Sequence, residues 1–475
     1  MSDGRKSFPH GEQSDIKTSR GLNNLPVRSE LRARGKSLRD QCPRESHALW
    51  KPPHHRHDPV HHLEESSKDR IAHLIPIRYG RMIQSPFSFY RGTALNMAAD
   101  LAVTPVSGLR VQACGDCHLC NVGGFATPER RIIADINDLD ETLPAPWEWD
   151  LKRLAASFVV ASRFNGHCEE AARDAALACV RSYRERILEY SKLSVLDVWY
   201  SSIDLEKLLL TIKDEESHKR LEKRLAKARQ RKVVDDDFPE LVTTAGMKPT
   251  IKENPPLIFH PREQDKHSFE QTLAQSFAAY RESLSEDRRL LLDRYQVIDA
   301  AVKVVGVGSV GTVCGILLLM ASDHDPLFLQ VKQARESVLE PYAGKSEYSN
   351  HGQRVVVGQR IMQSASDLFL GWTQGYLGRN YYLRQLRDMK IKPLVEIFSP
   401  SVMSVYAATC GWILARAHAR SGEPAMISGY LGKSDVFDGA IADFSASYAD
   451  QCEQDHDTLV QAVRAGRLEV FVESE

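Results

Sequence analysis

The sequence lacks an excess of charge of either sign and lacks any long apolar segment. Lys and Arg together number 62, Asp and Glu number 63, and the formal net charge is -1. Without a basic excess, composition gives no reason to expect a nucleic-acid partner or binding to an anionic membrane surface. The most apolar run, residues 313–321, is far shorter than the roughly 18 residues that span a bilayer. We therefore expect no membrane association.

Cysteines are few, and the N-terminus has no apolar signal segment. The 9 cysteines are an odd number with irregular spacing, which favours reduced thiols over a disulfide framework. Residues 1–21 contain no apolar stretch typical of a secretory signal, and no internal repeat is visible. These features predict a cytoplasmic globular protein. At about 150 residues per domain, the length predicts two or three domains.

Composition divides the chain into four segments. Residues 1–65 are rich in Arg, Ser, Gly, Pro and His, and we expect a disordered tail because so little apolar sequence cannot offset the entropy of ordering. Residues 66–300 are predicted to form a mainly helical lobe. Residues 301–375 are predicted to form a β-rich lobe, and residues 376–475 a helical segment that returns to the first lobe. The expected fold class is α+β.

Apolar periodicity predicts the individual elements. Helices are expected over 147–190, 268–300 and 402–420, and a heavily charged solvated helix over 205–232. Strands are expected at 108–116, 130–138, 303–308, 310–320, 327–334, 354–362 and 367–373. The proline-rich segment 249–262 is interpreted as a linker.

The sharpest motif is CGDCHLCNVGGF, followed by DINDLDE. It places Asp116 and Asn121 five residues apart in a loop between two predicted strands, and Asp138 ends the second strand. Phosphoryl transfer from Mg-ATP uses a carboxylate that receives the proton of the acceptor hydroxyl, with an amide oxygen and a second carboxylate on Mg²⁺. Asp116 is therefore the candidate base, and Asn121 and Asp138 are the candidate metal ligands. Asp135 is a rival to Asp138.

Other interpretations of the same residues stay open. Cys114, Cys117 and Cys120 have the chemistry to bind zinc or an iron–sulfur cluster, although no second ligand pair at finger spacing follows. The run from Cys114 to His118 matches the attachment pattern of c-type haem. The acidic DINDLDE is also compatible with an ordinary solvated or calcium-binding turn.

A glycine-rich motif follows much later in the chain. It is a G-x-G-x-x-G formed by Gly306, Gly308 and Gly311, with Ser309 inside it. The pattern alone is weak. Because β-type sequence follows it, a β-hairpin fits better than the strand-to-helix turn of a dinucleotide-binding fold. We interpret these residues as candidates for binding nucleotide phosphates.

The next predicted strand carries Lys332, and Glu340, or alternatively Glu336, follows as its candidate partner. A glycine-rich hairpin and then a strand lysine is the order found in the nucleotide lobe of protein kinases. In kinases this lobe precedes the catalytic loop, whereas here the loop with Asp116 comes first. A circularly permuted kinase-like fold reconciles the two orders, because the termini of a compact domain often lie close together.

The motifs resemble those of the aminoglycoside-phosphotransferase branch of the kinase-like superfamily. Its G-D-x-H-x-x-N loop corresponds to the run that starts at Gly115, its I-D-[FW]-x-D strand end to the run at Asn137, and its helix start to Trp149-Asp150-Leu151. The resemblance implies a two-lobed phosphotransferase that uses ATP and Mg²⁺ on the hydroxyl of a small molecule, with His118 orienting the loop. A non-catalytic nucleotide-binding protein and a nucleotidyl transferase are the alternatives.

From about residue 68 to 455 the chain is also similar to one bacterial family, domain-of-unknown-function family 2252. The resemblance is carried by RYGRM, SPFSFYRG, CGDCHLCNVGGF, DINDLDETLPAPWEWDLKRLAAS, KVVGVGSVGT, LFLQVKQA, GQRIMQSASDLFLGW, RQLRDMK, ARAHARSG and YADQ. It implies that the ordered region is one unit with a kinase-like fold. It implies no particular substrate.

Overall fold

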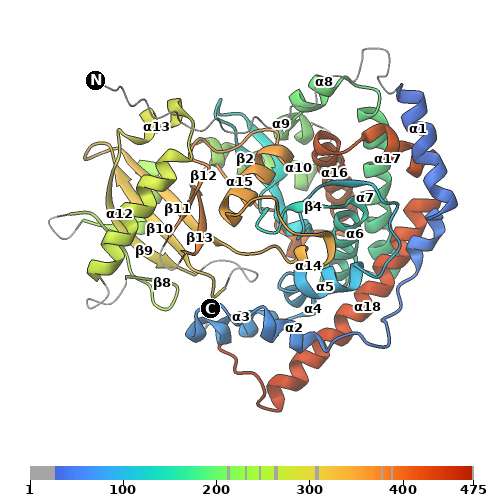
Figure 1. The fold of residues 1–475 in the computed structure, drawn as a ribbon, viewed down its shortest axis with the longest axis horizontal. Coiled ribbons are helices and arrows are strands. Elements are labelled where there is room, and N and C mark those ends of the chain that lie inside the picture. The colour runs from blue at the N-terminus through green and yellow to red at the C-terminus, as the bar shows by residue number, and fades with distance from the viewer. Residues whose placement is uncertain are drawn as a thin grey trace, which may run out of the picture.

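A computed structural model shows a mixed α and β protein in which a six-stranded sheet lies beside a larger helical part (Figure 1). It describes residues 27–472 except 211–213, 231–232, 245–247, 261–265, 305–309, 376–377 and 387–388. No helix in these described ranges is both long and apolar enough to cross a membrane.

Four long helices build the helical part around one apolar core. They are α6 (Trp147–Phe164), α7 (Glu169–Tyr190), α16 (Pro400–Ser421) and α18 (Val436–Arg464). The first sixteen of the 18 residues of α6 are buried, as expected of a helix enclosed on all sides. The helices predicted from periodicity over 147–190 and 402–420 are thereby confirmed, although the first is two helices with a short turn between them.

The sheet is antiparallel throughout, in the order β12-β13-β11-β10-β9-β8. Its strands are β8 (Ile258–Phe259), β9 (Gln296–Lys303), β10 (Cys314–Met320), β11 (Pro326–Ala334), β12 (Gly371–Gln374) and β13 (Asn380–Gln385). Alternate residues of β10 belong to two different apolar cores, one on each face of the sheet. Leu317 and Leu319 pack toward α12 (Lys266–Glu282) and α13 (Glu286–Leu292), whereas Leu318 lies in the core of the opposite face. This two-residue period follows from the pleat of a strand.

Short elements connect these parts and build the loops between them. The helices are α3 (Ile75–Met82), α4 (Pro86–Tyr90), α5 (Ala94–Leu101), α8 (Val195–Tyr200), α9 (Leu205–Leu209), α10 (Glu215–Gln230), α11 (Phe238–Leu241), α14 (Glu340–Ala343), α15 (His351–Met362) and α17 (Pro424–Leu431). The strands are β1 (Arg110–Ala113), β2 (Val122–Ala126), β3 (Ile132–Ile136), β4 (Leu143–Pro146), β5 (Ile203–Asp204), β6 (Val242–Thr243) and β7 (Thr250–Ile251). β1 pairs with β4, and β2, β3 and β5 form a second small sheet.

The expectation of a disordered tail over residues 1–65 is wrong for its second half; residues 1–26 lie outside the described chain. Two α-helices lie in this half, α1 (Arg28–Ser37) and α2 (Pro59–Glu65). Val60 and Leu63 of α2 are fully buried. Polar residues take part as well, because Arg39 donates from Nε to the carbonyl oxygen of Tyr430 at 2.7 Å. A few buried apolar residues and such long-range hydrogen bonds order a segment whose composition is polar.

Segment 354–362, predicted as a strand, is instead most of α15. Asn350 begins this helix by accepting a hydrogen bond from the backbone nitrogen of Gln353, and Val355 and Val356 are buried against the sheet. Burial therefore outweighs the preference of adjacent valines for strands. The interpretation of 249–262 as a linker is also incomplete, because the segment contains β7 and β8, and the sheet itself extends past 375 to β13.

The close packing of α16 on α7 depends on a glycine. A Cβ added at Gly411 would overlap the backbone carbonyl of Cys179, whereas a Cβ at Gly439 of α18 would meet nothing within 4 Å. We expect Gly411→Ala to lower the free energy of unfolding by about 2 kcal/mol or more, despite the better helix propensity of alanine. Gly439→Ala, the matched control, should raise it by up to about 1 kcal/mol. Urea unfolding of both variants measures the difference, and equal effects would contradict this packing.

Candidate functional site

The loop after β1, which carries Asp116, is anchored through its backbone by a buried carboxylate of α6. Asp150 accepts the backbone N–H of Cys114 at 2.6 Å and that of Gly115 at 2.9 Å. Nε2 of the buried His418 lies 3.1 Å from the same carboxylate. Gly115 has a φ of +82°, a conformation that glycine adopts without strain. The helix start at Asp150 therefore fixes the backbone of the loop.

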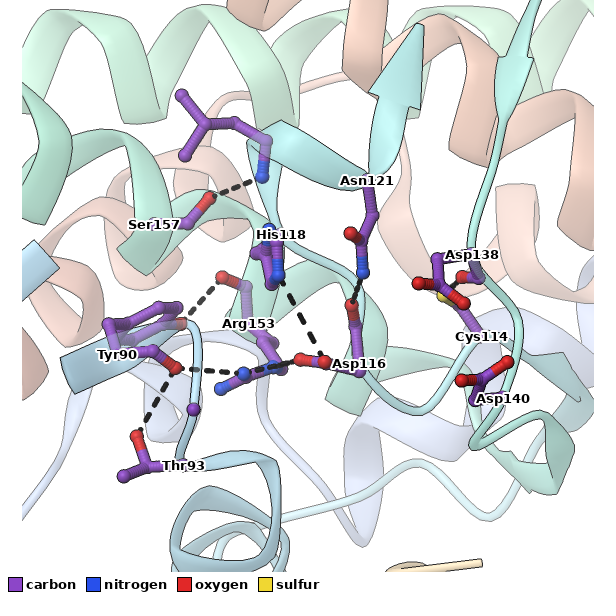
Figure 2. A network of polar contacts seen from close by, with 12 residues as sticks. Tyr90, Thr93, Cys114, Asp116, His118, Asn121, Asp138, Asp140, Arg153 and Ser157 are labelled. Atoms are coloured by element: carbon purple, nitrogen blue, oxygen red, sulfur yellow. Dashed lines mark hydrogen bonds and ion pairs between the residues drawn. The ribbon is translucent and has the colours of Figure 1, made fainter. Parts of the chain in front are cut away.

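Within the loop, Asp116 faces a buried arginine. Nε of Arg153 donates to Asp116 Oδ1 at 2.8 Å, and Nη2 reaches the same oxygen. Nδ2 of Asn121 donates to the Asp116 carbonyl oxygen at 2.8 Å. Burial lowers the pKa of His118 to about 4, so this imidazole is neutral, and it lies 4.0 Å from Asp116 Oδ2. Figure 2 shows Asp116 directed at Arg153, with Asn121 on its other side.

The acidic turn after β3 meets the lysine of the sheet. Nζ of Lys332 on β11 lies 3.2 Å from Asp138 Oδ1 and 2.6 Å from Asp140 Oδ2. The lysine is buried, whereas the side chains of Asp138 and Asp140 are 37% and 26% exposed. Two motifs that lie 194 residues apart in sequence thus form one partly accessible charged cluster between the sheet and the helical part.

The charged groups of this cluster shift one another's pKa values. Burial alone would lower the pKa of Lys332, but the two carboxylates raise it well above its usual value. Burial would raise the pKa of Asp138, but Lys332 and Arg384 hold it below its usual value. Burial and the neighbouring Asp138 raise the pKa of Asp140. The lysine is therefore fully charged at neutral pH.

Three residues of this cluster are not among the predicted site residues. Asp140 is the second carboxylate on Lys332, and the hydroxyl of Tyr382 on β13 donates to it. Arg384, also on β13, donates from Nη1 to the carbonyl oxygen of Asn137 at 2.9 Å. The acidic pattern of DINDLDE contains a signal for Asp140. Tyr382 and Arg384 are brought beside Lys332 by the pairing of β13 with β11.

The structure separates the two rival aspartates. Asp135 is fully buried, forms an ion pair with Arg416 at 2.6 Å and accepts hydrogen bonds from the backbone N–H and hydroxyl of Ser364. Asp138 is accessible and lies beside Lys332. The oxygens of Asp135 are therefore used in packing α16 against β3, and Asp138 remains the metal-ligand candidate.

The expected pairing of Lys332 with Glu340 is wrong. Glu340, at the start of α14, accepts the backbone N–H of Ser337 at 3.2 Å and lies 4.0 Å from Arg354. Asp138 and Asp140 take its place because the acidic turn projects directly under β11. Of the glycine motif, Gly311 is described, with a φ of +84°. Gly306, Gly308 and Ser309 lie outside the described residues.

The cysteines of the loop are structural in this arrangement. Cys114 and Cys117 are buried, and Sγ of Cys114 donates to the carbonyl oxygen of Asp138 at 3.4 Å. The contact with Cys114 alone would lower the pKa of Cys117, but burial together with the nearby Asp150 raises it to about 11, so a reactive thiolate is not favoured. Among the described residues, no group of three or more His, Cys, Asp or Glu is arranged to hold a metal ion.

The anchoring of the loop by Asp150 is open to direct measurement. In Asp150→Ala the amides of Cys114 and Gly115 and the ring of His418 lose a buried acceptor, so we expect a loss of about 3 kcal/mol of stability. The two amides should also exchange hydrogen faster than in the wild type. The control Asp443→Asn, in an exposed pair with Arg173, should change stability by less than about 1 kcal/mol. Unchanged exchange at both amides would contradict the anchoring role.

Comparison with known proteins places the chain in a family without giving it an activity. No curated protein and no solved structure matches it. A family model described as "Uncharacterized protein conserved in bacteria (DUF2252)" matches residues 70–462, which include every described residue of the site. The chain therefore belongs to the bacterial family DUF2252.

Proposed function

We propose that the protein is a phosphotransferase that uses ATP and Mg²⁺ to phosphorylate a hydroxyl group of a small molecule. The observation that supports it most is the meeting of Lys332 with Asp138 and Asp140. Phosphoryl transfer needs a cation for the nucleotide phosphates beside oxygens that hold a divalent metal. Both kinds of group are present here within one partly exposed cluster.

The donor set fits magnesium. Mg²⁺ prefers carboxylate and carbonyl oxygens and retains several waters, and Asp138 and Asp140 offer such oxygens beside Lys332. Asn121, whose backbone carbonyl accepts the N–H of Asn137 at 2.7 Å, would add its amide oxygen. When bound, the ion would neutralise charge on the transferred phosphoryl group. Lys332 would move its charge from the two carboxylates toward the phosphates, and Arg384 beside it would add a second cation. In this proposal Lys332 is the phosphate clamp of the nucleotide.

Asp116 would orient the acceptor hydroxyl. Arg153 occupies Oδ1, which leaves Oδ2 to accept the hydrogen of the hydroxyl. The transition state of phosphoryl transfer is loose, so that positioning of the acceptor contributes more than the strength of the base. A carboxylate fixed by a buried arginine and by the anchored loop is suited to positioning.

The proposal includes a kinase-like architecture in which the order of the two lobes is permuted, and two features of the fold are compatible with it. The hydroxyl of Ser421, at the end of α16, accepts the backbone N–H of Gln112 on β1 at 2.9 Å, although the two residues are 309 apart in sequence. A helix that precedes the catalytic loop in phosphotransferases would thus lie next to the strand that leads into that loop. Along the chain, α15 lies between the lysine strand β11 and the hairpin of β12 and β13, which is where kinases place their regulatory helix.

A non-catalytic nucleotide-binding protein is the second candidate, and the Asp116–Arg153 ion pair favours it. Arg153 occupies Oδ1 of Asp116, so this carboxylate already has a partner within the fold and its presence does not require a catalytic role. Binding of nucleotide would need Lys332 and the acidic pair but not a free Asp116. Measurements of binding and of turnover distinguish the two candidates.

The metal site is tested by thermal unfolding with and without Mg-ATP. At about 100 times its dissociation constant a ligand adds about 2.7 kcal/mol, so we expect the melting temperature to rise by several degrees. Asp138→Asn should lose the part of the shift that requires Mg²⁺, measured against ATP with a chelator, whereas the exposed control Asp443→Asn should keep it. The absence of any shift in the folded wild type at millimolar Mg-ATP would refute the proposal.

Catalysis is tested at Asp116. Asp116→Asn keeps the shape of the side chain but removes the carboxylate that would receive the proton of the acceptor hydroxyl. ADP production should therefore fall at least about 100-fold. The thermal shift with Mg-ATP should stay near the wild-type value, because the phosphates and metal are held elsewhere. Steady-state ADP release, with water or a screened alcohol as acceptor, gives the rate. Nucleotide binding without any turnover by the wild type would favour the second candidate.

A further inference from the structure

Three arginines from different segments converge on the C-terminal end of α2. The carbonyl oxygen of Ser66 accepts from Nε of Arg70 at 2.9 Å and from Nη1 of Arg335 at 3.1 Å. The hydroxyl of the next residue, Ser67, accepts from Nη1 of Arg78 at 2.8 Å. Arg335 follows β11, the strand of Lys332, whereas Arg78 lies on α3. We call Arg70, Arg78 and Arg335 the arginine cluster.

The arginine cluster lies beside the glycine-rich motif. Nη1 of Arg70 donates to the carbonyl oxygen of Val310, and the backbone N–H of Ile71 donates to that of Gly311 at 2.7 Å. A Cβ added at Gly311 would lie 3.0 Å from Cβ of Arg70. Leu74 and Ile77, next to the cluster in sequence, share a small apolar core with Val304 and Val310. The described residues on either side of 305–309 are thereby docked on this segment.

The positive charge of the cluster is poorly compensated. Asp69, at 3.5 Å from Arg335 and 79% exposed, provides the one ion pair to these arginines within the described chain. Arg78 is 2% exposed, and its Nε has no acceptor. The end of a helix contributes about half a negative charge at most, which does not balance three guanidinium groups. Burial and the neighbouring arginines lower the pKa of Arg70 well below its usual value, and the opposing charge of the nearby Glu141 does not offset them.

We propose that the arginine cluster binds a phosphate group beside Gly311. Guanidinium groups bind phosphate oxygens through paired N–H donors, and Arg70 and Arg335, which are partly exposed, would make these contacts. Arg78 is buried behind them and adds charge. The group is either a phosphate of the nucleotide or a phosphate carried by the acceptor. The assignment of the phosphate to the nucleotide or to the acceptor rests on the proposed function. Binding of phosphate by the arginine cluster does not, because it requires no transfer reaction.

The test uses inorganic phosphate as the probe, titrated against the full-length protein at constant ionic strength with chloride as the balancing anion. We expect the melting temperature of the wild type to rise with phosphate. In Arg335→Gln the apparent dissociation constant should increase about tenfold or more, since a charged hydrogen-bond donor is lost. Arg173→Gln, which removes an exposed arginine of α7 that pairs with Asp443, should behave as the wild type. Arg335 is chosen over Arg70 because it makes no contact with the glycine motif.

A second titration, at saturating Mg²⁺ and a non-hydrolysable ATP analogue, identifies the source of the phosphate. A retained response to phosphate supports an acceptor that carries a phosphate, and a lost response supports a phosphate of the nucleotide. No phosphate response in the folded wild type, or the same response in Arg335→Gln, would overturn the inference. Because the first titration contains no nucleotide, failure of the Mg-ATP experiments on Asp138 leaves this result interpretable by itself.

Discussion

A buried lysine cannot remain charged without nearby anions, and this constraint shapes the centre of the molecule. The side chain of Lys332, on the sheet, contacts the carboxylates of Asp138 and Asp140, which lie in the turn after β3. Removing one partner of a buried ion pair costs far more than the pair contributes over an apolar replacement. The sheet and the helical part are therefore coupled through charge at the place where the site must form, and a bound metal or phosphate would redistribute this charge.

Two further charged contacts complete the site, and each uses an element distant in sequence. Asp150 fixes the loop of Asp116 from α6, and Arg153, one helical turn later, fixes its side chain. On the other side, the segment from α2 to α3 carries arginines to the edge of the glycine motif. Acidic groups thus lie on the helical side of the lysine and basic groups near the glycines. This polarity suits a ligand that has both a metal-binding and a phosphate-binding end.

The errors of the sequence-based analysis share a physical origin. Residues 28–65 are ordered although their composition is polar, because arginines such as Arg39 bond to distant carbonyls. The valines of α15 favour a strand locally, but the space beside the sheet accommodates a helix. Glu340 was the candidate partner of Lys332 because it follows the lysine strand, yet the carboxylates of the acidic turn are the ones that lie beside the lysine. In each case a contact between residues far apart in the chain outweighed a local preference.

The sequence by itself determined the long helices, the central strands β10 and β11 and the residues of the two main motifs, whereas β9 overlaps the end of the helix predicted over 268–300. Periodicity and motif spacing are local, and local sequence encodes them fully. Tertiary structure alone decided that Lys332 meets Asp138, that Asp135 is buried with Arg416, and that Tyr382, Arg384 and the arginine cluster belong near the site. Charge pairing across hundreds of residues depends on how helices and strands pack, and no local pattern records that packing.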